Sequence, residues 1–131
     1  MVVQEGRIMY ELHFKGHFDA AHRLEDYKGK CNRLHGHRWE VQLGIVGDSL
    51  NTLNMLVDFG EVKKALNELL DSWVDHYYLN QTLKEANPTA EYLSKWIYDS
   101  MLAKVLSWDL DLKYVEVWES PECSVHYVGG R

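Results

Sequence analysis

Apolar and polar residues alternate along the first part of the chain. Every second residue from Ile8 to Phe14 is apolar, and the same parity continues to His22. Residues 38–45 repeat this alternation. A period of two is typical of a strand with one buried face. We therefore predict two β-strands, the second of which ends within the glycine-containing segment 44–48.

Two later segments follow the period of an α-helix. Asp58 begins a helix-capping pattern, and apolar residues then recur every three or four positions up to Trp73. Asn87 and Pro88 are typical of a helix start, with the asparagine as N-cap and the proline at the first helical position. The apolar residues after this start keep helical spacing to about residue 106. We predict two helices.

The chain closes with a predicted hairpin. Residues 112–119 are rich in valine and aromatic side chains, Pro121 lies in a turn, and residues 123–128 form the last strand. The order strand, strand, helix, helix, strand, strand predicts an α+β fold, with a four-stranded antiparallel sheet and both helices on one face.

The strand 112–119 has apolar residues on both of its sides. Tyr114 and Trp118 share one side, and Val115 and Val117 share the other. A strand with one solvated face would alternate apolar with polar residues. We therefore expect the second face of the sheet to be covered by another subunit.

Length and composition predict a single domain over residues 1–131. The chain has 131 residues, of which 46% are hydrophobic and 26% are charged, which is enough to bury a core. No apolar stretch approaches the roughly 20 residues that a membrane-spanning helix needs. The first residues alternate charge with apolar character, unlike a secretory signal. We expect a cytoplasmic protein without a membrane partner, in which Cys31 and Cys123 are thiols.

The chain is acidic. Its formal charge of −6 comes from 14 Lys and Arg against 20 Asp and Glu. Nucleic-acid affinity depends on cations that neutralise phosphates, so this balance disfavours a nucleic-acid partner. An anionic small ligand would need a local group of cations. The candidates near His35 are Arg23, Lys28, Lys30 and Arg33.

Histidines carry the main chemical signal. His35 and His37 are separated by one residue on a predicted strand, so their side chains point to the same side, and His22 on the neighbouring strand can complete a set of three nitrogen ligands. Three neutral imidazoles leave zinc its full charge and an open position for a substrate oxygen. Cys31 leaves two hypotheses open. As a fourth ligand it would close a structural site, and beside the metal its thiol would be a base or nucleophile.

Two further acidic positions are candidates for chemistry. Asp75 precedes His76, and such a carboxylate can hold an imidazole in one tautomer. Glu119 ends the strand 112–119, where a carboxylate beside a cavity could accept two hydrogen bonds from a guanidine-like edge. The remaining histidines are expected to be structural or exposed: His13, His17 and His126.

Together these motifs resemble the 6-pyruvoyl-tetrahydropterin synthase family, and most closely its 6-carboxy-tetrahydropterin synthase branch from queuosine biosynthesis. The resemblance covers residues 8–127 with the motifs in the same order. Ser120 and Asn54 stand where many relatives have threonine and glycine, and neither weakens the match. The matching segments are Phe18-Asp-Ala-Ala-His22, Cys31-x-x-x-His35-Gly-His37, Val57-Asp58-Phe59, Asp75-His76-x-x-Leu79-Asn80, Asn87-Pro88-Thr89-x-Glu91 and Glu119.

This resemblance implies the tunnelling fold, in which the sheets of several subunits join into an oligomeric barrel. The usual assembly is a homohexamer made of two trimers, with active sites between subunits. Zinc is the implied cofactor, and a pterin triphosphate is the implied substrate. The implied roles are zinc ligands for His22, His35 and His37, proton-abstracting base for Cys31, a catalytic pair for Asp75 and His76, and pterin anchor for Glu119.

By similarity, the reaction converts 7,8-dihydroneopterin triphosphate into 6-carboxy-5,6,7,8-tetrahydropterin, acetaldehyde and triphosphate. The short spacing between Cys31 and His35 resembles this branch, because pyruvoyl-forming enzymes typically have a longer gap. Two alternatives stay open. One is a pyruvoyl-forming or other pterin side-chain lyase, and the other is a non-catalytic, zinc-stabilised binding module with Cys31 as the fourth ligand.

Overall fold

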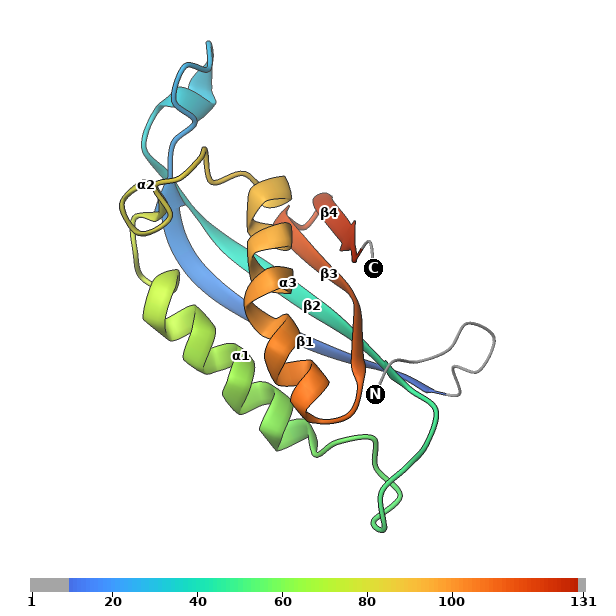
Figure 1. The fold of residues 1–131 in the computed structure, drawn as a ribbon. Coiled ribbons are helices and arrows are strands. Elements are labelled where there is room, and N and C mark those ends of the chain that lie inside the picture. The colour runs from blue at the N-terminus through green and yellow to red at the C-terminus, as the bar shows by residue number, and fades with distance from the viewer. Residues whose placement is uncertain (1–9, 130–131) are drawn as a thin grey trace.

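A computed structural model describes residues 10–129 and shows a four-stranded antiparallel sheet with its long helices on one face (Figure 1). The strands lie in the order β1-β2-β3-β4, and η1 is a short 3-10 helix. The elements are β1 (Tyr10–His22), η1 (Lys30–Asn32), β2 (His35–Gly47), α1 (Phe59–Trp73), α2 (Leu79–Thr82), α3 (Ala90–Ser107), β3 (Asp111–Ser120) and β4 (Cys123–Val128).

The four predicted strands and the two long helices are present in the predicted order. The predicted start of the first strand at Ile8 lies outside the described residues. The short elements η1 and α2 were not predicted, because segments of three and four residues are too short to show a periodic pattern. No helix among residues 10–129 is long and apolar enough to cross a membrane. Cys31 and Cys123 are free thiols, as predicted.

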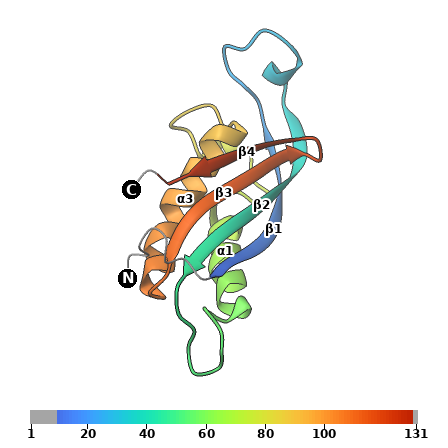
Figure 2. The ribbon, with the colours of Figure 1, turned by 90° about the vertical axis from the view of Figure 1, so that its right-hand side faces the viewer.

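The alternation of the strands places one face of the sheet in the core. Phe18 of β1 and Trp39 of β2 are fully buried and stack with ring centroids 5.8 Å apart. Helices α1 and α3 lie on this face, as the two views of the ribbon show (Figures 1 and 2). Leu66 of α1 and Ile97 of α3 are each 0% exposed. Burial of one such side chain contributes about 1.5–3 kcal/mol, so this layer supplies much of the stability.

The start of α1 follows the prediction, and the start of α3 does not. The carboxylate of Asp58 caps α1 by accepting a hydrogen bond of 2.8 Å from the Gly60 N–H. Helix α3 begins at Ala90 with Thr89 as its N-cap, so the predicted cap at Asn87 is wrong. The reason is tertiary: the Asn87 amide is bonded to the backbone of a distant segment, which leaves the Thr89 hydroxyl to accept from the helix.

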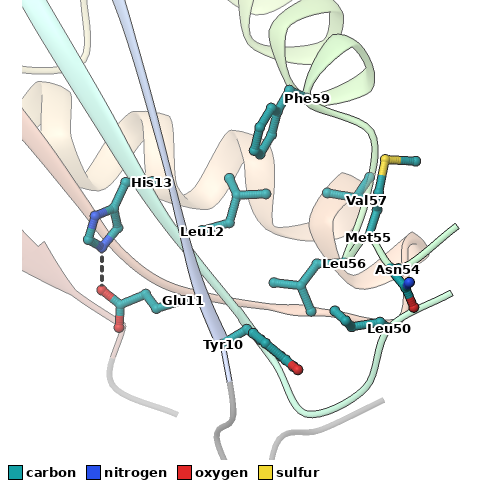
Figure 3. Close-up of a pocket in the computed structure, with 10 residues that line it drawn as sticks. All are labelled: Tyr10, Glu11, Leu12, His13, Leu50, Asn54, Met55, Leu56, Val57 and Phe59. Atoms are coloured by element: carbon teal, nitrogen blue, oxygen red, sulfur yellow. Dashed lines mark hydrogen bonds and ion pairs between the residues drawn. The ribbon is translucent and has the colours of Figure 1, made fainter.

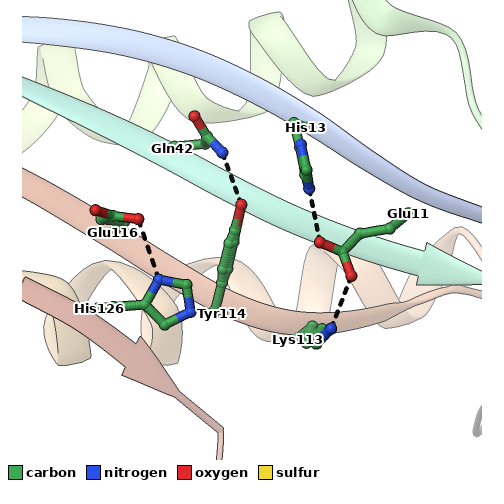
Figure 4. Close-up of polar contacts among 7 residues, drawn as sticks. All are labelled: Glu11, His13, Gln42, Lys113, Tyr114, Glu116 and His126. Atoms are coloured by element: carbon green, nitrogen blue, oxygen red, sulfur yellow. Dashed lines mark hydrogen bonds and ion pairs between the residues drawn. The ribbon is translucent and has the colours of Figure 1, made fainter.

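The other face of the sheet carries polar contacts that join strands (Figure 4). The carboxylate of Glu11 on β1 lies 2.6 Å from the His13 ring and 2.9 Å from the Lys113 ammonium on β3, across β2. On β3, the Glu116 carboxylate contacts the His126 ring of β4 at 3.1 Å. His13 and His126 are exposed, as expected, and each has a carboxylate partner that was not predicted.

Tyr114 fills the middle of this polar face. Its ring is only 4% exposed, because it crosses β2 where Gly44 has no side chain and packs against the His126 ring. Its hydroxyl accepts a hydrogen bond of 2.7 Å from the Gln42 amide. Tyr114 therefore needs no second subunit to be buried, contrary to the expectation from its apolar character. Cover by another subunit over the rest of this face, where Trp118 is half-buried, stays a prediction.

We expect Gly44→Ala to lower the free energy of unfolding by about 1–3 kcal/mol, the usual range for overpacking. A Cβ at this position would lie 2.6 Å from the Tyr114 ring. Gly36 lies on the same face of β2 and is the matched control, since a Cβ there meets only a carbonyl oxygen at 3.9 Å. Urea unfolding of both variants measures the difference. Equal stability of Gly44→Ala and the parent chain would show that the ring is free to move aside.

Candidate metal centre and active site

Three histidines from two paired strands converge at one end of the sheet. His22 ends β1 and pairs directly with His35, which begins β2, while His37 lies opposite Ala20. The ring centroid of His22 is 4.5 Å from that of His35 and 5.2 Å from that of His37. The His22 and His37 rings rest against the buried Trp39 indole, whose centroid is 4.9 Å from that of His22 and 5.4 Å from that of His37. The prediction that these side chains share one side of the sheet is confirmed.

Backbone carbonyls orient two of the three rings. The Nδ1 of His22 lies 2.8 Å from the Pro88 carbonyl oxygen, and the Nδ1 of His35 lies 2.7 Å from that of Arg33. A carbonyl only accepts, so each contact assigns the ring hydrogen to Nδ1 and leaves the Nε2 lone pair free. This is the usual arrangement of a metal-binding histidine.

The free nitrogens point into a space that a metal ion would fill. The Nε2 atoms of His22 and His37 are buried and make no hydrogen bond of suitable geometry among the described residues, and their nearest polar neighbour is the Glu119 carboxylate. Buried polar atoms without a partner are rare and call for an explanation, such as an ion. The donor set of imidazole nitrogens is one that zinc prefers. The residues present therefore fit a divalent metal ion.

Glu119 supplies a fourth oxygen donor to this cluster. Its Oε1 lies 3.0 Å from the Nε2 of His37 and 3.4 Å from that of His22. The candidate ligand atoms of the three histidines and Glu119 all lie within 4.8 Å of one another. Neighbouring donors in a tetrahedral zinc site with bonds of about 2.0–2.1 Å lie about 3.3–3.5 Å apart, so these spacings suit an N₃O set.

Glu119 was not predicted to belong to the ligand group. The family resemblance implied a pterin-anchoring role for this carboxylate, and spacing along β3 shows only which side of the strand the residue faces. The available signal was the antiparallel pairing of β2 with β3, in which Glu40 lies opposite Trp118. That register brings the next residue of β3 beside the histidine end of β2.

Burial keeps His22 and His37 in the form that binds metal. It is the main cause that lowers the pKa of His22, and the nearby His35 ring adds to this effect, while the bond to Pro88 opposes it. Burial also lowers the pKa of His37, against the opposing charge of Glu119. Both imidazoles are therefore neutral at neutral pH, with a lone pair available for a metal ion.

Cys31 lies beside the histidine cluster in the chain but outside the group of four donors. It is half-buried on η1, and its carbonyl accepts a hydrogen bond of 2.7 Å from the Leu24 N–H, two residues after His22. The group of candidate donor atoms includes Glu119 and does not include Cys31. The hypothesis of a closed site made of Cys31 and the three histidines is therefore not supported.

Asp75 and His76 form a second cluster on the edge of β1. The Nδ1 of His76 lies 3.0 Å from one carboxylate oxygen of Asp75, and the other oxygen accepts from the Asp19 N–H at 2.9 Å. The His76 N–H donates to the Asp19 carbonyl at 2.6 Å. The His76 side chain is 78% exposed, so it can reach a molecule in solvent or in a neighbouring subunit.

An open hollow of about 540 Å³ has residues of both clusters in its wall. Arg38 donates to both oxygens of Asp19 at 2.9 and 3.0 Å, and this contact holds the pKa of the Asp19 carboxyl below its usual value. Arg23, another of the cations considered for an anionic ligand, also has a side-chain partner, because its guanidinium donates to the Asn32 side chain at 2.7 Å. The hollow is lined by Asp19, Ala20, Ala21, Gly36, His37, Arg38, His76, Tyr77 and Tyr78.

A separate apolar cavity of about 400 Å³ lies at the opposite end of β1 (Figure 3). Figure 3 shows Leu12, Leu56 and Phe59 turned toward one another there, between β1 and the segment that leads into α1. None of the residues predicted to act in chemistry lines it. The histidine end of the sheet is therefore the candidate site.

Comparison with known proteins gives one consistent result. Residues 11–130 match the 6-pyruvoyl tetrahydropterin synthase family. The 6-carboxy-5,6,7,8-tetrahydropterin synthase of Synechocystis sp. is 37% identical over 127 residues, covering 94% of this chain and 96% of the relative. The protein of the same name from Bacillus subtilis is 34% identical over 97 residues, covering 72% and 66%. The 6-pyruvoyl tetrahydropterin synthase of Caenorhabditis elegans superposes with a TM-score of 0.82 at 26% identity, covering 92% and 96%.

We expect zinc to raise the thermal unfolding midpoint of the metal-free chain, because binding to the folded state alone stabilises it. His35→Ala removes one of the oriented donors and should abolish this increase. His126→Ala is the control, since this ring lies on the polar face of the sheet with Glu116. Differential scanning calorimetry with and without zinc measures the midpoints. An equal zinc response of His35→Ala and His126→Ala would contradict the site.

Proposed function

The chain belongs to the 6-pyruvoyl tetrahydropterin synthase family, and on this premise we propose that it converts 7,8-dihydroneopterin triphosphate into 6-carboxy-5,6,7,8-tetrahydropterin, acetaldehyde and triphosphate. The names of the relatives support a coarser assignment, which is an enzyme of the lyase type that acts on pterin side chains. The carboxy-forming branch is favoured by relatives of that name, among them those of Synechocystis sp. and Bacillus subtilis. Such a reaction would belong to queuosine biosynthesis.

The observation that carries the proposal is the set of convergent imidazoles with free Nε2 atoms. In this proposal, His22, His35 and His37 hold zinc. When bound, zinc would polarise the side-chain hydroxyls of the substrate and stabilise negative charge that develops on oxygen. Neutral ligands suit this task, because they leave the ion its full charge.

Cys31 is proposed as the base that takes a proton from the substrate side chain. A thiolate beside a cationic site is favoured over the thiol, and positioned bases accelerate proton transfer by about 10²–10⁴-fold. The position of Cys31 outside the donor group supports this role over that of a ligand. The Asp75–His76 pair would supply or relay protons, with Asp75 holding the ring in one tautomer.

Two features support active sites shared between subunits. The ligand atoms of the Asp75–His76 pair do not belong to the donor group of the histidine cluster in the same chain. The His76 ring is exposed and therefore available to an adjoining subunit. We propose a homohexamer of two trimers, with sheets joined into a barrel, in which the pair of one subunit serves the zinc of its neighbour.

Mass analysis of the products tests the reaction itself. The zinc-loaded chain is incubated with 7,8-dihydroneopterin triphosphate beside a chelated control. We expect 6-carboxy-tetrahydropterin and acetaldehyde only with zinc. A pyruvoyl product would move the chain to the sister branch. No turnover by folded, zinc-loaded protein would favour the zinc-stabilised binding module instead.

We expect Cys31→Ala to lower turnover by about 10²–10⁴-fold, since it removes the proposed base, and to leave zinc binding intact. Cys123→Ala is the matched control, because this thiol lies exposed on β4. Turnover and bound zinc are measured on the same samples. Loss of zinc from Cys31→Ala would restore the fourth-ligand hypothesis, and unchanged turnover would remove Cys31 from the reaction.

Glu119→Gln separates the two roles that this carboxylate can have. As a pterin anchor, Glu119 recognises the ring with its charge, so the variant should raise KM and keep its zinc affinity. As a metal ligand, it would instead lose zinc affinity. We expect the first result, and a competition titration with a chromophoric chelator, run beside substrate kinetics, distinguishes them. An unchanged KM would exclude the anchoring role.

A further inference from the structure

The free edge of β1 is completed by a distant segment at the point where the strand carries His22. β1 is the first strand of the sheet and pairs with β2 on one side only. On its other side, the Asp19 N–H donates to the Asp75 carboxylate, and the Asp19 carbonyl accepts from the His76 N–H. The Ala21 N–H then donates to the Tyr77 carbonyl at 3.2 Å.

Two asparagine side chains continue this edge beyond the end of the strand. Asn80 accepts from the Arg23 N–H and donates to the Arg23 carbonyl, both at 2.9 Å. Asn87 does the same for Glu25, with both contacts at 3.0 Å. A side-chain amide has the donor and acceptor of a peptide group. Each asparagine therefore bonds the chain as a neighbouring strand would.

The position of Asn87 links this edge to the histidine cluster. The next residue is Pro88, whose carbonyl accepts from the Nδ1 of His22 at 2.8 Å. Residues 87 and 88 thus contact two points of this segment, the His22 ring at the end of β1 and the Glu25 backbone beyond it. The His22 ring is 1% exposed, so this carbonyl takes the place of water as the partner that assigns its tautomer.

A role in starting α3 does not explain Asn87. Thr89 caps that helix by accepting from the Tyr92 N–H at 3.1 Å. Both hydrogen bonds of the Asn87 side chain, one donated and one accepted, are made with the Glu25 backbone. Its contacts therefore concern the path of the chain that follows His22.

We propose that Asn87, assisted by Asn80, is a positioning residue of the histidine cluster: it holds the Pro88 carbonyl against His22 and so keeps the His22 Nε2 free for the metal ion. The claim that Asn87 affects metal binding rests on the proposed function, while the claim that it controls the tautomer of His22 does not. Substituting a group that orients a metal ligand typically lowers metal affinity about 10- to 100-fold. Since Asn87 acts through Pro88, we expect the lower end of this range.

Zinc affinity of Asn87→Ala, measured by competition with a chromophoric chelator, is the first test. We expect a decrease of about tenfold. Asn51→Ala is the matched control: Asn51 is also exposed and makes two side-chain hydrogen bonds to backbone, to Leu53 and Met55 at 2.9 and 3.1 Å, but it lies far from the histidines, after β2. Its zinc affinity should equal that of the parent chain. Equal zinc affinities of Asn87→Ala and Asn51→Ala would refute the proposed effect of Asn87 on metal binding.

The tautomer of His22 is the second readout, and a merely structural role would not change it. NMR of the ¹⁵N-labelled imidazole in the metal-free chain should show the Nδ1–H form in the parent and in Asn51→Ala. We expect a mixture of tautomers in Asn87→Ala. Asn87→Asp, which keeps the acceptor for the Glu25 N–H, should lie between them and covers the case in which the alanine variant does not fold.

The two readouts separate this proposal from the proposed function. A parent chain that binds no zinc would refute the metal site, yet the His22 tautomer would still respond to Asn87. A parent chain that binds zinc through His22, combined with an unchanged tautomer in both Asn87 variants, would refute the positioning role alone.

Discussion

The register between β1 and β2 is the constraint on which the rest of this structure depends. It places His22 opposite His35 and sets His37 two pairs further along, opposite Ala20. Side chains on a strand alternate between faces, so a slip of one residue would turn His22 toward the polar face and expose Phe18 as well. The stacked Phe18 and Trp39 rings disfavour such a slip, because both are fully buried. Core packing and the histidine cluster thus share one cause.

Burial gives the cluster its chemistry and also creates its need for partners. The His22 and His37 imidazoles are held against the Trp39 indole and lose water, which favours their neutral form. The buried Nδ1–H of His22 needs a protein acceptor, which Pro88 provides, and Arg33 provides one for His35; both acceptors come from loops and not from the sheet. The segment 75–88 therefore has two tasks: it closes the free edge of β1 and it carries groups of the candidate site.

The polar face shows that burial does not require a second layer. Tyr114 is buried under neighbouring side chains of its own sheet, because Gly44 leaves room for the ring. The surrounding ion pairs, such as Glu11 with Lys113, are partly exposed and contribute little to stability on their own. The packing of the Tyr114 ring over Gly44 therefore contributes more to stability on this face than these ion pairs do.

Local patterns in the sequence were enough to predict the strands, the two long helices and the shared orientation of the three histidines. These features depend on periods of two and of about 3.6 residues, and a period reports which side of an element a residue faces. Only the tertiary structure decided three other features: the hydrogen bonds of Asn87 to Glu25, the place of Glu119 among the candidate donors and the burial of Tyr114. Each of these depends on contacts between segments far apart in the chain, and no local period encodes which distant backbone or ring a side chain will meet.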